Sequence, residues 1–229
     1  MADLGWVWVG TLLKGLVGAR RPDLAVCIAG ASTRHFSLAK GPTWGRRGGN
    51  HDFLENNNTR LDALTPIIDS LKNDNIVYLK NRGVYEDENV NWCVYSLVEH
   101  NIPPDILKSD KKNIGLFHGP VRGLKTNLGY IFEDHEFTTD KFKGCDLVLC
   151  GDIHTRQVFD IPNGKKAYMV GSTIQQNFGE TISKHGYGVY DLEKDEYSFV
   201  DLPNPKPFLS FYIDSIDALV DGTEKLVNY

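Results

Sequence analysis

The chain has 229 residues, of which 41% are hydrophobic and 24% are charged, and its formal net charge is −5. This composition is ordinary for a globular protein, and the negative balance excludes a globally basic nucleic-acid binder. Contact with DNA or RNA would need a local basic patch, although scattered basic residues more often form a solvated surface. The residues available for such a patch are Lys108, Lys111, Lys112, Arg122, Lys125, Lys141, Lys143, Lys165 and Lys166.

An apolar stretch at residues 5–19 is the first notable segment. It is too short to span a bilayer, is interrupted by Lys14, and lacks the basic start of a signal peptide. We therefore expect a cytoplasmic protein that makes no contact with a membrane. The cysteines form no C-x-x-C pair, and most lie in apolar runs, which indicates reduced, buried thiols. These cysteines are Cys27, Cys93, Cys145 and Cys150.

The composition changes sharply near Gly48. Residues 1–48 contain no Asn and no Glu but hold 8 of the 22 glycines, whereas residues 49–229 contain 16 Asn. The change indicates a fusion, a misread frame or an engineered junction; the alternative is a Gly-rich N-terminal region of unusual composition. We therefore divide the chain into an atypical segment at 1–48, a core at 49–205, and a linker with the start of a truncated C-terminal module at 206–229.

Beyond Gly48 the pattern is that of an α/β protein. Apolar residues recur at helical spacing in 59–72, where Pro66 marks a kink or a helix start. Short β-rich runs follow, and helical signals become sparse after residue 143, which favours buried parallel strands first and antiparallel strands later. The predicted strands are 76–79, 92–98, 113–118, 146–150, 166–171, 187–192 and 197–202, with a further run from 208 after the proline-rich linker 202–208.

Three turns carry side chains that can bind a metal. A glycine precedes Asn50-His51-Asp52, the strand run 113–118 ends in His118, and the run 146–150 leads into Gly-Asp-Ile-His at 151–154. Because ligands gather at the carboxyl ends of strands in α/β sheets, we expect these turns to meet in space. Each motif alone is more often a polar turn or a structural histidine, but the three in this order are much more specific.

In this order the motifs resemble the later motifs of the calcineurin-like metallophosphoesterases, G-N-H-D or G-N-H-E, a strand-end His, and G-H-x-H. The stretches GSTIQQNFGE at 171–180 and HGYGVYDL at 185–192 resemble one branch, the DNA double-strand-break repair nucleases of SbcCD type, including their phage counterparts. The resemblance covers about residues 49–215. It implies a four-layer α/β/β/α sandwich with two mixed sheets, and the nuclease subunit of a DNA repair or recombination complex.

The resemblance also implies a metal centre of two divalent cations. Asn50, His118 and Asp152 would bind one cation, and His154 would bind its neighbour. Two such cations clamp a phosphoester and activate a water molecule, and mixed nitrogen and oxygen ligands suit manganese. The implied partners are DNA and an SbcC-type ATPase subunit, and a homodimer remains open. The implied location is the cytoplasm, or the host cytoplasm if the chain is phage-encoded.

Two further residues have implied catalytic roles. His51 would stand near the leaving oxygen as general acid or charge stabiliser, and Asp52 would orient His51. The family usually has His at position 152, where Asp can still bind a hard cation.

The first motifs of the family are missing from this sequence. No D-x-H occurs near the start, and Ala31 stands where the bridging aspartate is expected, with His35 as the other nearby candidate ligand. We therefore hypothesise low or absent nuclease activity. The alternatives are a phosphoesterase acting on small phosphodiesters or phosphoproteins, and a binding module that has lost its metals.

Overall fold

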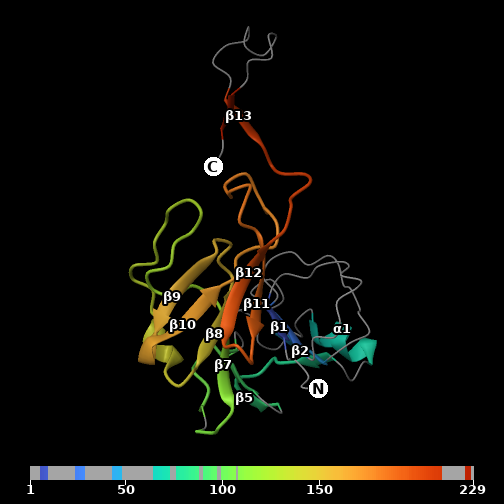
Figure 1. Cartoon of the computed structure of the whole chain (residues 1–229), viewed down its shortest axis with the longest axis vertical. Helices are drawn as coiled ribbons and strands as arrows, with labels where there is room; N and C mark the ends of the chain where they lie inside the picture. Colours follow the sequence, from blue (N-terminus) through green and yellow to red (C-terminus); the bar gives the residue numbers. More distant parts are fainter. Residues whose placement is uncertain are drawn as a thin grey trace.

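A computed structural model describes residues 6–9, 24–28, 43–47, 64–72, 76–87, 90–96, 99–106, 108–212 and 225–227. Within these ranges the central element is a six-stranded sheet with the order β5-β6-β7-β8-β10-β9 (Figure 1). Its strands are β5 (Gly83–Glu86), β6 (Val90–Val94), β7 (Lys112–His118), β8 (Leu147–Gly151), β9 (Gln157–Ile161) and β10 (Lys165–Met169). The four inner strands are parallel, while β5 and β9 are antiparallel at the two edges, so the sheet is mixed.

Three smaller sheets complete the described strands. One is antiparallel, with β11 between β1 and β12; one is parallel, with the order β2-β3-β4; and the third is the antiparallel pair β13-β14. β1 also lies beside β2, so the first two of these sheets adjoin. Their strands are β1 (Trp6–Val9), β2 (Leu24–Ile28), β3 (Thr43–Arg47), β4 (Ile76–Tyr78), β11 (Gly186–Asp191), β12 (Glu196–Asp201), β13 (Ser210–Tyr212) and β14 (Lys225–Val227).

The six-stranded sheet is buried on both faces because successive side chains of its inner strands alternate between two apolar cores. Trp92 belongs to the first core, which also contains Tyr190 of β11 and packs against Tyr197 of β12. Cys93 and Tyr95 belong to the second core. The antiparallel sheet of β11 and β12 therefore contributes to one face of the six-stranded sheet.

The second face is covered by the irregular segment 119–146 and its 3-10 helix η1 (Thr139–Phe142). Helix α1 (Leu64–Leu71) is the only α-helix in the described part of the chain. Pro66 lies in its first turn, where the missing N–H costs no helical hydrogen bond. Lys72 follows the helix with φ +44°, the left-handed conformation that commonly ends helices.

The α/β class is confirmed. The predicted order holds for β6, β7, β8 and β10, which are parallel, and for the later antiparallel β11 and β12, but the early strand β5 is antiparallel. Most strand predictions agree with the structure within two residues, but the prediction of 92–98 is wrong because β6 covers Val90–Val94. The chain turns after Tyr95, since the Ser96 hydroxyl donates to the Lys80 carbonyl at 2.5 Å. β5 and β9 were not predicted. The described cysteines are buried and unbridged, as expected: Cys93, Cys145 and Cys150.

Within the described residues, no helix combines the length and apolar character that crossing a membrane requires. Of the apolar stretch 5–19, only strand β1 (Trp6–Val9) lies within the described residues, so the expectation drawn from that stretch stays a prediction.

Candidate metal site

The ends of two neighbouring parallel strands bring His118 and Asp152 together. His118 is the last residue of β7 and lies directly opposite Gly151, the last residue of β8. Asp152 follows Gly151, and its Oδ1 lies 3.5 Å from Nε2 of His118. The Gly119 N–H donates to the Gly151 carbonyl at 3.2 Å, which continues the pairing beyond the strands. Adjacent parallel strands thus place two residues, 34 positions apart in the sequence, side by side.

His118 is fixed by its surroundings, whereas Asp152 faces partly outward. The side chain of His118 is 1% exposed, and the carbonyl of His118 accepts a hydrogen bond of 2.9 Å from Asn101 Nδ2. Asp152 adopts φ +96°, which side-chain-bearing residues rarely do. A strained residue beside a buried histidine is a common feature of functional sites, because the surrounding fold must hold the strained conformation.

The spacing of these two side chains fits a shared cation. Two ligands at about 2.1 Å from one ion lie about 3.0–3.4 Å apart in octahedral or tetrahedral geometry. The observed 3.5 Å is close to that range and is longer than the usual N–H···O hydrogen bond of about 2.9 Å. An imidazole nitrogen and a carboxylate oxygen suit manganese, iron or zinc. The pair could therefore supply two ligands to one divalent cation.

His154 lies in the same turn and is oriented by a buried carboxylate. Its Nδ1 donates to Oε1 of Glu180 at 2.7 Å, and Glu180 is only 3% exposed. This hydrogen bond assigns the Nδ1 proton and leaves Nε2 as the nitrogen available to a ligand. The hydrogen bond to Glu180 raises the pKa of His154 above its ordinary value, with smaller contributions from the charges of Glu180 and Asp152.

Glu180 is held by several donors at once. Besides His154, it accepts hydrogen bonds from the Gln176 backbone N–H at 2.9 Å and from Asn177 Nδ2 at 2.9 Å. Burial raises the pKa of Glu180, but the hydrogen bonds from His154 and Gln176 outweigh burial, so its pKa lies below the ordinary value. Glu180 is therefore an ionised carboxylate that orients the imidazole.

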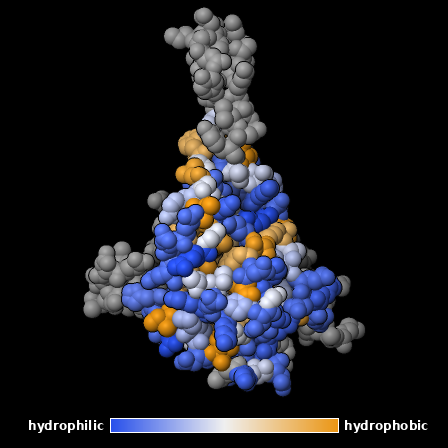
Figure 2. Space-filling view, turned by 90° about the vertical axis from the view of Figure 1, so that its left-hand side faces the viewer, coloured by the Kyte–Doolittle hydropathy of each residue, from blue (hydrophilic) through white to orange (hydrophobic). Residues whose placement is uncertain are grey.

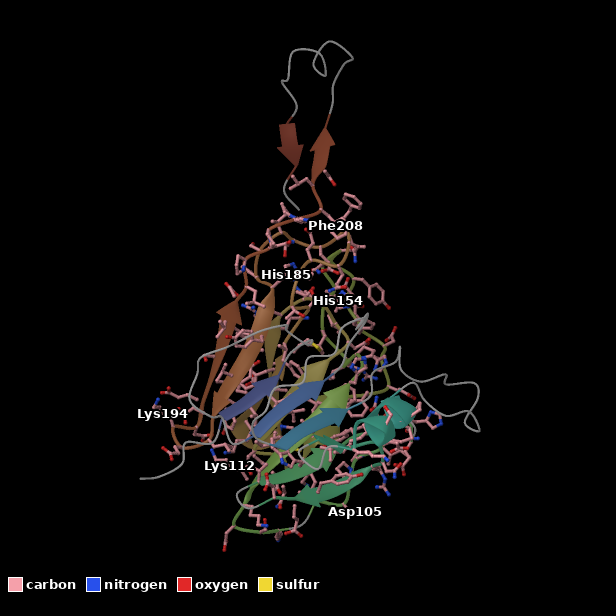
Figure 3. The ribbon with its side chains drawn as sticks, turned by 90° about the vertical axis from the view of Figure 1, so that its right-hand side faces the viewer. Asp105, Lys112, His154, His185, Lys194 and Phe208 are labelled. Atoms are coloured by element: carbon pink, nitrogen blue, oxygen red, sulfur yellow. The ribbon has the colours of Figure 1, made fainter. Side chains whose placement is uncertain are left out.

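A second histidine extends this network. Ser172 Oγ lies 3.2 Å from Glu180 Oε2 and 2.9 Å from Nδ1 of His185, so the hydroxyl connects the two groups. Nε2 of His185 donates to the Thr181 carbonyl at 2.6 Å. His154 and His185 both lie at the end of the strands nearest to Phe208 (Figure 3).

Gly171 allows the chain after β10 to pack against this turn. The glycine has φ +81°, and a Cβ at this position would lie 2.8 Å from the carbonyl oxygen of His154. The N–H of Ser172 donates to that same carbonyl at 3.2 Å. A residue with a side chain would push apart the two segments that bring His154 to Glu180.

The predicted site is only partly within the described residues. Asn50, His51 and Asp52 lie outside them, as do Ala31 and His35. Among the residues that the structure describes, no three His, Cys, Asp or Glu side chains are arranged to hold one metal ion. His118 and Asp152 therefore form a pair, and the assignment of His154 to a neighbouring cation stays a prediction.

Sequence analysis did not identify Glu180, Ser172 and His185 as members of the hydrogen-bond network of His154. Glu180 is 26 residues from His154 and His185 is 13 residues from Ser172, and contacts at such separations have no periodic signature. The available signal was the likeness of the stretches 171–180 and 185–192 to repair nucleases, which assigned no role to individual residues.

The described chain is thus an α/β protein with two histidines and an aspartate at the carboxyl edge of its mixed sheet. No model of a known protein family matches the sequence. The chain is similar to an uncharacterized protein of Acanthamoeba polyphaga mimivirus, with 35% identity over 167 residues. This similarity covers 68% of the chain but only 12% of the viral protein, so the chain spans a small part of that relative.

Proposed function

We propose that the chain is a metal-dependent phosphodiesterase of the calcineurin-like class and the nuclease subunit of a DNA repair or recombination complex. The observation that carries this proposal is the meeting of His118 and Asp152 at 3.5 Å, with His154 oriented by buried Glu180 in the same turn. Such an arrangement is typical of hydrolytic metal sites, where carboxylates fix the histidine ligands.

The four-layer α/β/β/α sandwich is the fold that we propose for the complete core. Two features support it. The six-stranded mixed sheet shares an apolar core with residues of β11 and β12. Strand β1 pairs with β11 and also lies beside β2, so the antiparallel sheet adjoins the parallel sheet of β2, β3 and β4. Two sheets packed face to face would result, with the candidate metal site at their shared carboxyl edge.

Each residue of the proposed site has a distinct task. His118 and Asp152, together with Asn50, would hold one cation, and His154 would hold the neighbouring one. Bound manganese ions would neutralise the phosphoester oxygens and lower the pKa of a water molecule. Glu180 keeps the Nδ1 proton of His154 in place, so that Nε2 would be the nitrogen available to a cation.

Two residues next to Asn50 would act on the substrate. His51 would donate a proton to the leaving oxygen or stabilise its charge, and Asp52 would orient His51. Because Ala31 replaces the bridging aspartate of the family, we expect the second cation to bind more weakly than the first and the nuclease activity to be low. DNA and an SbcC-type ATPase subunit are the proposed partners, and assembly as a homodimer is an alternative. The cytoplasm is the proposed location.

Calorimetric titration with Mn²⁺, combined with hydrolysis of plasmid DNA and of a chromogenic phosphodiester, tests this function. We expect binding of Mn²⁺ that His154→Asn weakens and that His100→Asn, a change at an exposed histidine, leaves unaltered. Preference for plasmid DNA would support the nuclease branch. Preference for the small phosphodiester would favour a phosphoesterase acting on small substrates in place of a nuclease. Absence of Mn²⁺ binding would overturn both functions.

A further inference from the structure

Three exposed apolar side chains lie on segments that contact the loop of Glu180. Leu128 is 80% exposed, Phe178 58% and Phe208 40%, and each lies on a different segment of the chain. We call these three residues the rim patch. Apolar atoms are visible at the narrow end of the described part of the molecule, among hydrophilic ones (Figure 2), and Phe208 lies beyond His154 and His185 at the same end (Figure 3).

The members of the rim patch are connected to one another. The rings of Phe178 and Phe208 meet edge to face with centroids 5.0 Å apart. A Cβ on Gly179 would lie 3.3 Å from Cδ2 of Leu128, so this leucine rests against the residue next to Phe178. The loop that carries Leu128 is hydrogen-bonded to the turn after β8 that carries His154, since Thr155 Oγ1 donates to Asn127 Oδ1 at 2.7 Å.

The rim patch is held rigidly by buried polar groups. Gln175 is 3% exposed; its side chain accepts from the Phe208 N–H at 2.8 Å and donates to the Phe208 carbonyl at 3.2 Å. Glu180 anchors the loop of Phe178 through Gln176 and Asn177. Since the rings stay exposed although their backbone is fixed, they are preorganised to bind a ligand.

The three segments that carry the rim patch have a positive charge balance, in contrast to the whole chain. Its segments 124–130, 174–184 and 202–209 contain Lys125, Lys184 and Lys206, all exposed, and their only acidic residue is buried Glu180. In the described ranges none of these lysines forms an ion pair. Rigid aromatic rings among cations favour a polyanion with flat apolar groups.

Four of the nine basic residues considered from sequence are neutralised by ion pairs. These four lysines pair with carboxylates at 2.5–3.5 Å: Lys111 with Glu86, Lys112 with Asp195, Lys165 with Asp146, and Lys166 with Asp160. Among the residues considered, Lys125 alone belongs to the segments of the rim patch, which adds Lys184 and Lys206.

We propose that the rim patch binds single-stranded nucleic acid, with bases stacking on Phe178 and Phe208 and phosphates contacting Lys184 and Lys206. Base faces are hidden in a duplex and accessible in a single strand, so an aromatic surface selects unpaired nucleotides. Next to the proposed metal site, such a surface would hold an unpaired strand for cleavage. The choice of ligand thus rests on the proposed nuclease function, whereas binding itself needs no metal.

Fluorescence anisotropy in EDTA, with a labelled oligothymidylate of about 12 nucleotides and a blunt duplex of equal length, tests the proposal. We expect tighter binding of the single strand and a loss of about tenfold for Phe178→Ala, the effect of one stacked base. Phe178→Leu keeps an apolar side chain without a ring and should lose nearly as much. Lys206→Ala should reduce the slope of log affinity against log salt by about 0.7.

The matched controls are Val158→Ala, an exposed apolar residue on β9, and Lys194→Ala, an ion-paired lysine at the opposite end of the sheet. Both should leave binding unchanged, and circular dichroism confirms folding of each variant. Equal binding by Phe178→Leu and wild type would overturn base stacking. If the variants changed only the sedimentation of the chain, the patch would be a protein contact and the proposal wrong. Because the binding assay is run in EDTA, loss of single-strand binding in it is distinguishable from failure of the metal-dependent nuclease function.

Discussion

The two ends of the six-stranded sheet differ in how their charged side chains are paired. At the amino end of β7, Lys112 pairs with Asp195 at 2.5 Å and donates to the Tyr190 hydroxyl at 2.9 Å. The hydrogen bond from Lys112 is the main reason that the pKa of Asp195 lies below its ordinary value. Lys194 similarly pairs with Asp191 at 3.1 Å. This end is a set of mutually neutralised groups.

At the carboxyl end the same sheet collects a buried histidine, the strained residue Asp152, and His154 held by Glu180. His118 and Asp152 lie 3.5 Å apart, a distance that suits a shared cation better than a direct hydrogen bond, whereas His154 and Glu180 are directly hydrogen-bonded at 2.7 Å. The amino end is thus held by paired charges, whereas the carboxyl end carries a strained residue at the site that we propose to bind a cation. Each of the following predictions tests one side of this comparison.

Asp152→Asn should have the largest effect, on metal affinity. The change keeps the size of the side chain and tolerates the positive φ, but it removes the charge that attracts the cation. We expect Mn²⁺ affinity to fall by more than about 100-fold, the upper range for loss of an outer partner. Calorimetric titration measures this effect. Asp195→Asn, which removes a carboxylate from the amino end, should leave the affinity unchanged, and an equal loss there would refute the comparison.

Glu180→Gln should weaken Mn²⁺ binding by about 10- to 100-fold, because His154 loses the carboxylate that orients it. In the metal-free protein, the pKa of His154 should fall toward its ordinary value, since the hydrogen bond to Glu180 is the main cause of its rise. Titration of the imidazole signals by NMR follows both the pKa and the position of the proton. An unchanged His154 pKa would mean that Glu180 does not act on the imidazole.

The same pair predicts a window of pH for stability. The raised pKa of His154 stabilises the fold below the ordinary histidine value, and this contribution is lost as pH rises through the folded pKa. The lowered pKa of Glu180 stabilises the fold above the ordinary glutamate value, and this contribution is lost as pH falls through its folded pKa. Urea unfolding at several pH values in EDTA should show a maximum between these limits that Glu180→Gln flattens.

Gly171→Ala should lower the free energy of unfolding by about 2–3 kcal/mol, as expected for overpacking together with a positive φ. The added Cβ would lie 2.8 Å from the His154 carbonyl. Gly164→Ala is the matched control, because Gly164 has φ +69° but no atom within 4 Å of a Cβ. Urea unfolding should show a loss of only about 1 kcal/mol for the control. Equal losses would mean that the packing against His154 costs nothing.

Lys111→Met should have the smallest effect. Lys111 pairs with Glu86 at 3.1 Å on the surface of the amino end. Exposed pairs of this kind contribute about 0.2–1 kcal/mol to stability. Urea unfolding should therefore show a change within that range, and Mn²⁺ affinity should stay the same. A large change in metal affinity would show that the two ends are coupled.

The strands of the sheet were predictable where the chain is apolar on both faces. β7 and β8 are short runs of buried residues that end in polar turns, and both were found within one residue. β5 and β9 escaped prediction because edge strands bury only part of their side chains and their sequences, GVYE and QVFDI, show little continuous apolar character.

The candidate site was predictable where it follows directly from the strands. His118 ends β7 and Asp152 directly follows β8, so the parallel pairing alone brings them together. Glu180 reaches His154 from a loop 26 residues away, and the path of that loop depends on Gly171 and on buried hydrogen bonds that no local pattern encodes. The role of the 50–52 turn stays a prediction.

Anomalous diffraction from crystals soaked in Mn²⁺ tests the central claim most directly. We predict a manganese peak at about 2.2 Å from both Nε2 of His118 and a carboxylate oxygen of Asp152. A fully loaded protein whose manganese lies away from both side chains would contradict the account.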